Sequence, residues 1–132
     1  MKADPRTKEE ILAVLNEFDR VSREQDLAGV MRIFVHDGAI FIGSESGAEA
    51  KGIEQIRSFF EELFSGPIAY GFCWQEIDIH VVGDMAWLFT DCQIETISAA
   101  GHHKHPYRVT AIFQRVEGLW RWIHYHGSEP VG

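Results

Sequence analysis

The sequence predicts one α+β domain in which helices near the N-terminus cover one face of an antiparallel β-sheet. Apolar residues recur at helical spacing in the first half of the chain, and from Ile68 onward the apolar period changes to two. The 132 residues, of which 45% are hydrophobic and 24% charged, suit one globular domain. Helices followed by a run of strands are typical of the α+β class.

Three helices are expected before residue 68. Thr7 and Glu10 form a capping box that starts a helix over residues 7–24. Asp26 caps a second helix, residues 39–43 form a short strand, residues 44–50 a polar loop, and residues 52–64 the third helix. The residues expected to face inward are Ile11, Leu15, Phe18 and Val21 or Ser22, then Leu27, Val30, Met31 and Phe34, then Ile53, Ile56, Phe59 or Phe60, and Leu63.

Four strands of about 10 residues are expected after Ile68, separated by turns at 83–84, 100–101 and 117–118. A turn centred on Gly83 and Asp84 pairs Val82 with Met85, and this register divides the first hairpin into two faces. The apolar face, expected under the helices, holds Ile77, Ile79, Val81, Ala86, Leu88, Thr90, Cys92 and Ile94. The outer face holds Trp74, Glu76, Asp78, His80, Trp87, Phe89, Asp91 and Gln93.

Neither face of the last hairpin is decisively polar, so its orientation stays open at this point. One face holds Tyr107, Val109, Ala111, Phe113, Trp120, Trp122, His124 and His126, and the other holds Arg108, Thr110, Ile112, Gln114, Arg121, Ile123 and Tyr125. A slip of one residue would exchange the two faces.

Charge and cysteine content exclude several classes of protein. With 12 basic and 20 acidic residues the net charge is −8, which disfavours a nucleic-acid partner. No apolar run is long enough for a membrane helix, and the first residues lack the apolar core of a signal peptide. Cys73 and Cys92 have no CxxC spacing, so we expect free thiols in a cytoplasmic protein with no cofactor and no bound metal.

The segment 118–130 resembles the C-terminal strand of SnoaL-like proteins of the nuclear-transport-factor-2-like superfamily. It is most similar to the branch that contains the association domain of calcium/calmodulin-dependent kinase II. The residues that carry the resemblance are Gly118, Trp120, His124, Tyr125, His126, Ser128 and Pro130. The upstream order of helices and the strand at Phe41 also fit, so the resemblance spans about residues 7–130 of a single domain over residues 1–132.

The resemblance implies a cone-shaped, strongly bent sheet wrapped around the N-terminal helices, with a cavity at its wide end. On that basis we expect the histidine and tryptophan face of the last hairpin to point inward. Thr90, Tyr107, Trp122, His124 and His126 would then bind a ligand, with His124 as the acid/base group. The alternative is that the two histidines are hydrogen-bonded structural residues.

The resemblance also implies a homodimer through the outer face of the sheet, which would bury Trp74, Trp87 and Phe89. Ketosteroid isomerase belongs to the same superfamily, but its tyrosine and its basic aspartate fall on Phe18 and Ile42 here. Neither side chain can transfer a proton, so the resemblance does not carry that activity over.

Two other polar groups could carry chemistry. Glu76 and Asp91 become cross-strand neighbours in the predicted register, which suits either a paired-acid site or salt bridges at a dimer interface. The run His102–His105 offers imidazoles for a metal, but it lies in a predicted hairpin loop and suits a solvated turn better.

Two functions follow from these observations. The first is a small-molecule-binding cavity protein, with lyase or isomerase chemistry on a hydrophobic organic substrate. The second is a non-catalytic module for homo-oligomerisation. A cavity of about 300 Å³ or more with polar groups in its wall would favour the first.

Overall fold

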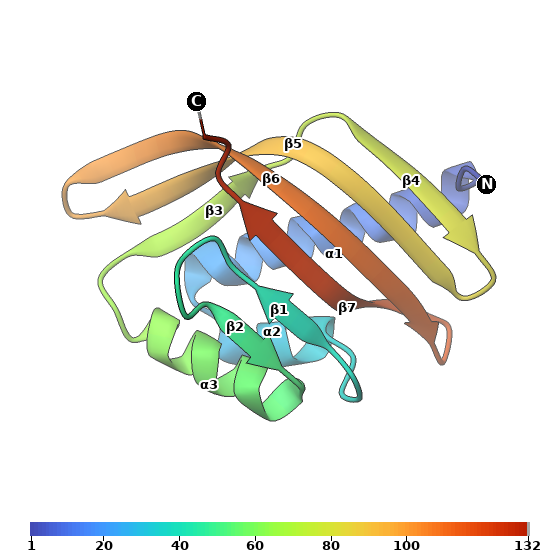
Figure 1. Cartoon of the computed structure of the whole chain (residues 1–132), viewed down its shortest axis with the longest axis horizontal. Coiled ribbons are helices and arrows are strands. Elements are labelled where there is room, and N and C mark those ends of the chain that lie inside the picture. The colour runs from blue at the N-terminus through green and yellow to red at the C-terminus, as the bar shows by residue number, and fades with distance from the viewer. Residues whose placement is uncertain (132) are drawn as a thin grey trace.

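The computed structural model describes residues 1–131, which form three helices packed against a mixed, mainly antiparallel sheet (Figure 1). The strand order is β2-β1-β7-β6-β5-β3, and β4 pairs with β5 outside this path. β1 and β7 run parallel, and the other pairs are antiparallel. The elements are α1 (Pro5–Glu24), α2 (Leu27–Ile33), β1 (Ile40–Ile42), β2 (Glu49–Lys51), α3 (Ile53–Phe64), β3 (Ala69–Cys73), β4 (Ile77–Val82), β5 (Met85–Ser98), β6 (Gly101–Val116) and β7 (Leu119–Ser128).

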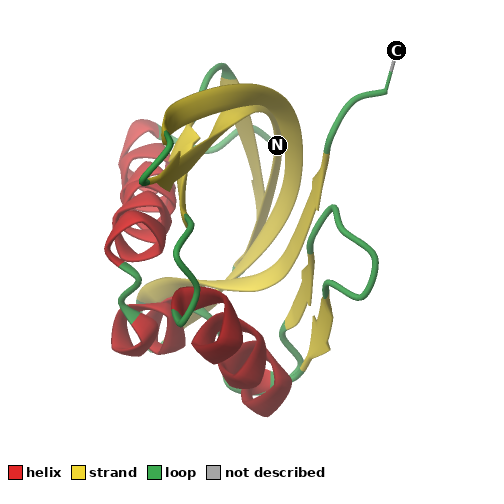
Figure 2. Ribbon diagram, turned by 90° about the vertical axis from the view of Figure 1, so that its left-hand side faces the viewer, coloured by secondary structure: helices red, strands yellow, loops and turns green. Residues whose placement is uncertain are grey.

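The sheet is strongly curled, which confirms the predicted α+β cone. Figure 2 shows the long strands bending over, with helices along one side and below. The core lies between these layers, and its largest fully buried side chains include Trp122, Tyr125, Phe18 and Phe34. Within residues 1–131, no helix has both the length and the apolar character needed to cross a membrane.

The cap of α1 differs from the prediction. Asp4, not Thr7, is the N-cap: its carboxylate accepts the backbone N–H of Thr7 at 2.7 Å, and Pro5 begins the helix. Proline at the first helical position fixes a helical φ and gives up a backbone N–H that would lack a partner there anyway. The Asp-Pro pair therefore moves the helix start two residues upstream.

The predicted inward positions of the helices are largely confirmed. On α1, Val21 and Ser22 are both buried, and on α3 the choice between Phe59 and Phe60 falls on Phe60. On α2 the buried stripe lies at Val30 and Ile33 and continues to Phe34, while Met31 is half-buried.

The sheet has more strands than predicted. The expected polar loop contains β2, which pairs with β1, and five strands follow Ile68 in place of four. β5 is long enough to pair with β4 along its first half and with β3 along its second half. The histidines at 102–105 belong to β6 rather than to a loop, because the turn occupies only Ala99 and Ala100.

Helix α1 also covers the free edge of β3. The carboxylate of Asp19 accepts the backbone N–H of Phe72 at 2.6 Å and the Nε of Arg23 at 2.8 Å. The guanidinium of Arg23 lies over Gly71, where a Cβ atom would clash with it, and donates to Glu95 at 2.6 Å. A side chain at residue 71 would therefore require the guanidinium of Arg23 to shift from this position.

The predicted register of the β4–β5 hairpin is confirmed from Val82↔Met85 to Ile77↔Thr90. Trp87 and Phe89 lie on the outer face and are 40% and 51% exposed. Trp74 does not join them: its indole N–H donates to the Leu15 carbonyl at 3.0 Å and its ring stacks on Phe72. The prediction that Trp74 belongs to an exposed outer patch is wrong, because the chain leaves the sheet between Cys73 and Ile77.

A β-bulge in β7 inverts the second half of the last hairpin. Phe113 pairs with Trp122, but Ile112 pairs with His124, so Ile123 is an extra residue. The indole N–H of Trp122 donates to the His124 carbonyl at 2.8 Å, which bridges the bulge. Beyond Ile123, Tyr125 points into the core and the two histidines point outward.

Candidate functional site

A cavity of about 330 Å³ opens between α3, the loop after β1, β3 and the far part of the β5–β6 hairpin. The elements that enclose it come from both halves of the chain, so only the complete fold forms it (Figure 1). The lining residues are Phe18, Ser22, Phe41, Gly43, Ser44, Glu45, Ala48, Phe59, Phe60, Leu63, Phe64, Ile68, Ala69, Tyr70, Phe72, Ile94, Thr96, His105, Tyr107, Tyr125 and Glu129.

The inner wall of the cavity is aromatic. The ring of Tyr125 stacks on Phe41 with centroids 4.4 Å apart and planes 9° from parallel. The ring centroid of Phe18 lies 5.7 Å from that of Tyr125, and the ring centroid of Phe60 lies 5.0 Å from that of Phe41. Closely packed rings fix one another's orientation, so this wall is apolar and well ordered.

Two phenol groups form the polar part of the inner wall. The Tyr125 hydroxyl donates to the Tyr107 hydroxyl at 3.3 Å, and both residues are buried. Gly127 lies beside them, and a Cβ atom there would collide with the Tyr107 hydroxyl. The absence of a side chain at residue 127 therefore leaves the space in which the two phenols meet.

Both phenols are neutral at physiological pH. Burial raises the pKa of Tyr107, against the opposing effect of the Tyr125 and Ser44 hydroxyls. Burial also raises the pKa of Tyr125 well above its ordinary value, and the neighbouring Tyr107 adds to this effect. A neutral phenol that accepts one hydrogen bond retains its own O–H for donation, so Tyr107 can donate to a ligand oxygen.

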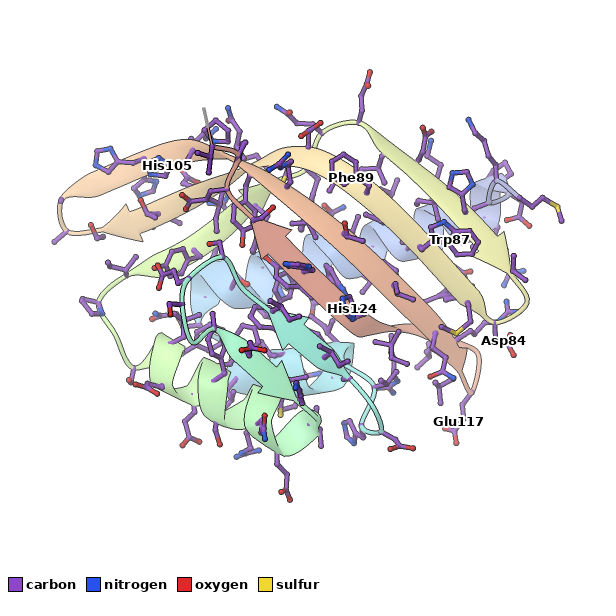
Figure 3. All side chains as sticks on the ribbon, in the orientation of Figure 1. Asp84, Trp87, Phe89, His105, Glu117 and His124 are labelled. Atoms are coloured by element: carbon purple, nitrogen blue, oxygen red, sulfur yellow. The ribbon has the colours of Figure 1, made fainter. Side chains whose placement is uncertain are left out.

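The mouth of the cavity is polar and exposed. Glu45 and Ser44 come from the loop after β1, Glu129 follows β7, and His105 projects from β6 two residues before Tyr107. Figure 3 labels His105 on the outlying part of the β5–β6 hairpin. Among residues 1–131, no group of three His, Cys, Asp or Glu side chains is placed to hold a metal ion.

Of the five predicted ligand-binding residues, only Tyr107 lines the cavity. Thr90 lies on the inner face of β5, completely buried, and its hydroxyl donates to the Asp91 carbonyl at 3.1 Å. Trp122 is completely buried in the core beside the bulge. Both residues were predicted to face inward and do so, but they are buried in the core and do not line the cavity.

The prediction that His124 and His126 line the cavity is wrong. They pair with Ile112 and Thr110, on the face that also carries Trp87 and Phe89. Figure 3 shows His124, Trp87 and Phe89 on the same side of the sheet. Burial and the nearby His126 lower the pKa of His124. Its place on the outer face leaves it no contact with a ligand in the cavity.

The remaining candidates provide no proton-transfer site in the cavity. Phe18 lines the cavity but Ile42 does not, and the neighbouring positions Phe41 and Gly43 carry no proton-transfer group either. Glu76 precedes the start of β4, and Asp91 pairs with Arg108, so the two carboxylates do not form the predicted paired strand positions. Cys73 and Cys92 are free, and burial raises the pKa of Cys92 to about 12, so that its thiol is unreactive.

The most important residue that sequence reasoning missed is Tyr125. It was assigned to the outer face because regular alternation was assumed through residue 123. One signal could have corrected this assignment: two imidazoles need solvent or polar partners more than a tyrosine and a glycine do. The cavity residues of the loop 43–48 carried no pattern that sequence reasoning could use.

A family model for the SnoaL-like domain matches residues 11–132 of the chain. No curated protein sequence matches it. Among solved structures, a candidate aromatic ring hydroxylase from Novosphingobium aromaticivorans superposes with a TM-score of 0.86 at 18% identity, over 99% of this chain and 94% of the other. A candidate dehydratase from Streptomyces avermitilis gives 0.81 at 14% identity, over 98% and 100%.

A nuclear-transport-factor-2-like protein from Salmonella enterica gives a TM-score of 0.83 at 19% identity, over 98% of this chain and 95% of the other. At these identities the likeness concerns the fold. The family model supports the SnoaL-like domain, and the solved structures support a nuclear-transport-factor-2-like fold. Neither comparison specifically supports the branch of the kinase association domain.

Proposed function

Because the chain belongs to the SnoaL-like family, whose fold encloses the aromatic cavity described above, we propose that it binds a hydrophobic organic molecule there. The observation that carries the proposal is a wall of stacked rings interrupted by one buried pair of phenols. Such a wall gains free energy from burying apolar surface, and a single polar group orients the ligand. The ligand expected is a ring compound with one oxygen that accepts from Tyr107.

Binding can be tested with the neutral dye Nile red, whose fluorescence rises in apolar surroundings. Ala69 on β3 lines the cavity, so Ala69→Trp fills it and should weaken dye binding at least tenfold. Ala100→Trp, in the exposed turn between β5 and β6, is the matched control and should bind as the parent does. Dye binding that survives Ala69→Trp but is lost in Trp87→Ser would place the dye on the outer face and contradict the proposal.

The finer part of the proposal is a proton-transfer activity of the lyase or isomerase type on the bound compound. Tyr107 and His105 lie on the same face of β6, about 7 Å apart along the strand. A ligand between them would meet a phenol that donates to its oxygen and an imidazole that takes a proton from carbon. His105 replaces His124 as the acid/base candidate because it lines the cavity.

This activity can be measured as deuterium uptake from heavy water by tetralone, a bicyclic ketone with acidic hydrogens next to its carbonyl. The protein should accelerate the exchange, and His105→Gln should remove about a hundredfold of the acceleration. The control is His103→Gln. His103 lies two residues before His105 on the same face of β6, but it does not line the cavity. Equal exchange rates for the parent and His105→Gln would exclude His105 from proton transfer.

A second candidate function, homodimerisation through the outer face, has its own observation. Trp87 and Phe89 are too exposed for isolated surface residues of their size, and His80 stacks on Trp87 with centroids 5.8 Å apart. We expect light scattering to give twice the chain mass for the parent and the single-chain mass for Trp87→Ser/Phe89→Ser. A monomeric parent protein would refute the dimer. The free thiols favour the cytoplasm as the compartment in which either function operates.

A further inference from the structure

The mouth of the cavity has a one-sided charge. A second hollow of about 440 Å³ adjoins the cavity and shares six lining residues with it, among them Glu45, Phe59 and Tyr70. Over both hollows the lining includes three carboxylates, those of Glu45, Glu62 and Glu129. It includes no lysine or arginine among residues 1–131.

The basic residues of this region are directed elsewhere. Arg23 at the end of α1 is bonded to Asp19 and Glu95. Lys104 pairs with Glu95 across the β5–β6 hairpin, on the strand face opposite to His105. A ligand in the mouth therefore meets three carboxylates and the His105 imidazole, with no lysine or arginine among the described lining residues.

The carboxylates also act on the phenols of the cavity. Burial is the main reason that the pKa of Tyr70 is raised, and the charge of Glu45 adds to it. The charge of Glu129 adds in the same way to the raised pKa of Tyr107. Glu45 and Glu129 are thus close enough to influence a charge placed among these rings.

We propose that the cavity takes a hydrophobic organic amine in its protonated form, with the rings inside and the ammonium group among Glu45, Glu62 and Glu129 at the mouth. This inference rests on the proposed function and adds the charge class of its ligand. Phe59 and Tyr70, which line both hollows, present aromatic rings that attract a cation. The net charge of −8 adds a long-range attraction for cations, and an organic anion is repelled.

The test compares three ligands that share one ring system: naphthylethylamine, naphthylethanol and naphthylacetate. Calorimetric titration at low salt should show the amine binding about fivefold to tenfold more tightly than the alcohol, and the acetate more weakly than both. High salt should reduce the difference between amine and alcohol, because the carboxylates at the mouth are exposed.

Variants then assign the preference to the mouth. Glu45→Gln/Glu62→Gln/Glu129→Gln should remove the preference for the amine while the affinity for the alcohol stays unchanged. Glu61→Gln, on an exposed position of α3 outside both linings, is the control for net charge and should keep the preference. An equal loss in Glu61→Gln would overturn the assignment to the mouth.

The two proposals fail in different ways in this experiment. If the alcohol binds in the cavity and the amine binds no more tightly, the charge preference is refuted and the proposed function stands. If neither the amine nor the alcohol binds, both proposals are refuted.

Discussion

The two halves of the β6–β7 hairpin place their side chains by opposite rules. Near the turn, Trp122 pairs with Phe113 and both are buried, as regular alternation predicts. Beyond Ile123, Tyr125 occupies the inner face and His126 the outer face, against that alternation. One inserted residue therefore decides which side chains form the wall of the cavity. A single irregularity in a strand has more influence on a site than any one residue in it.

The largest effect is expected from inserting an alanine between Ile112 and Phe113, which gives Ile123 a partner on β6 and so removes the bulge. Restored alternation would turn Tyr125 outward and His126 into the core, so one polar group is buried without partners and a large ring is exposed. We expect a loss of more than about 4 kcal/mol in unfolding free energy, or no cooperative unfolding transition at all. Chemical denaturation followed by near-ultraviolet circular dichroism measures this. An insertion variant as stable as the parent would show that the bulge does not control the faces.

The next comparison sets an inner residue of β7 against an outer one. Trp122 is completely buried, so Trp122→Ala should cost about 3–5 kcal/mol through lost burial and the cavity left behind. His126 is exposed, and His126→Ala should change stability by less than about 0.5 kcal/mol. Urea denaturation of both variants provides the measurement, and similar losses would mean that the two faces are not distinguished as described.

A smaller effect is expected at Gly127, in the inverted half of the hairpin. Gly127→Ala brings a Cβ atom against the Tyr107 hydroxyl, and the phenol must shift. We expect a cost of about 1–3 kcal/mol, together with weaker binding of Nile red. Gly66→Ala, where the added Cβ meets one carbonyl at 3.4 Å, is the control and should stay within about 0.5 kcal/mol. If Gly127→Ala has the same unfolding free energy and the same affinity for Nile red as the parent, the phenols can shift without cost.

The smallest effect concerns His124 and pH. Its folded-state pKa is lowered below the ordinary value of 6.5, mainly by burial, so the unfolded chain binds its proton more readily. This contribution to stability is fully present above pH 6.5 and is lost as pH falls through that value toward the folded-state pKa. His124→Asn should remove this part of the pH dependence, measured as the parent-minus-variant difference in unfolding free energy. A difference that does not change with pH would contradict the burial of the imidazole.

Sequence reasoning could predict the features that depend on local periodicity. The helix faces at Leu15 and Ile56, and the β4–β5 register around Gly83, follow from spacing and turn chemistry alone. It could not predict the bulge at Ile123. The choice between two faces of mixed polarity depends on the packing of Trp122 and Tyr125 against Phe18 of α1. The position of Trp74 was missed for a related reason, since only tertiary contact with Leu15 draws its ring from the sheet.

The candidate site was less predictable than the fold. Tyr107 was found because the family resemblance placed its face of β6 inward, whereas Glu45 and Glu129 reach the mouth through irregular segments with no periodic signal. A cavity formed by the ends of several elements depends on how those elements meet, and spacing within one element carries little information about that.

The hydrogen bond from the Phe72 N–H to Asp19 has a consequence for the behaviour of the protein at high concentration. A free strand edge is a template on which another chain can add, and growth of that kind leads to fibrils. On the β3 side, the helix carboxylate already occupies a backbone donor that an incoming strand would need. On the opposite side, β2 offers only three residues, two of them charged. The edge at β3 is therefore protected by a side-chain acceptor, and the edge at β2 by brevity and charge. Strand addition at β3 requires the Asp19 carboxylate to give up this hydrogen bond first.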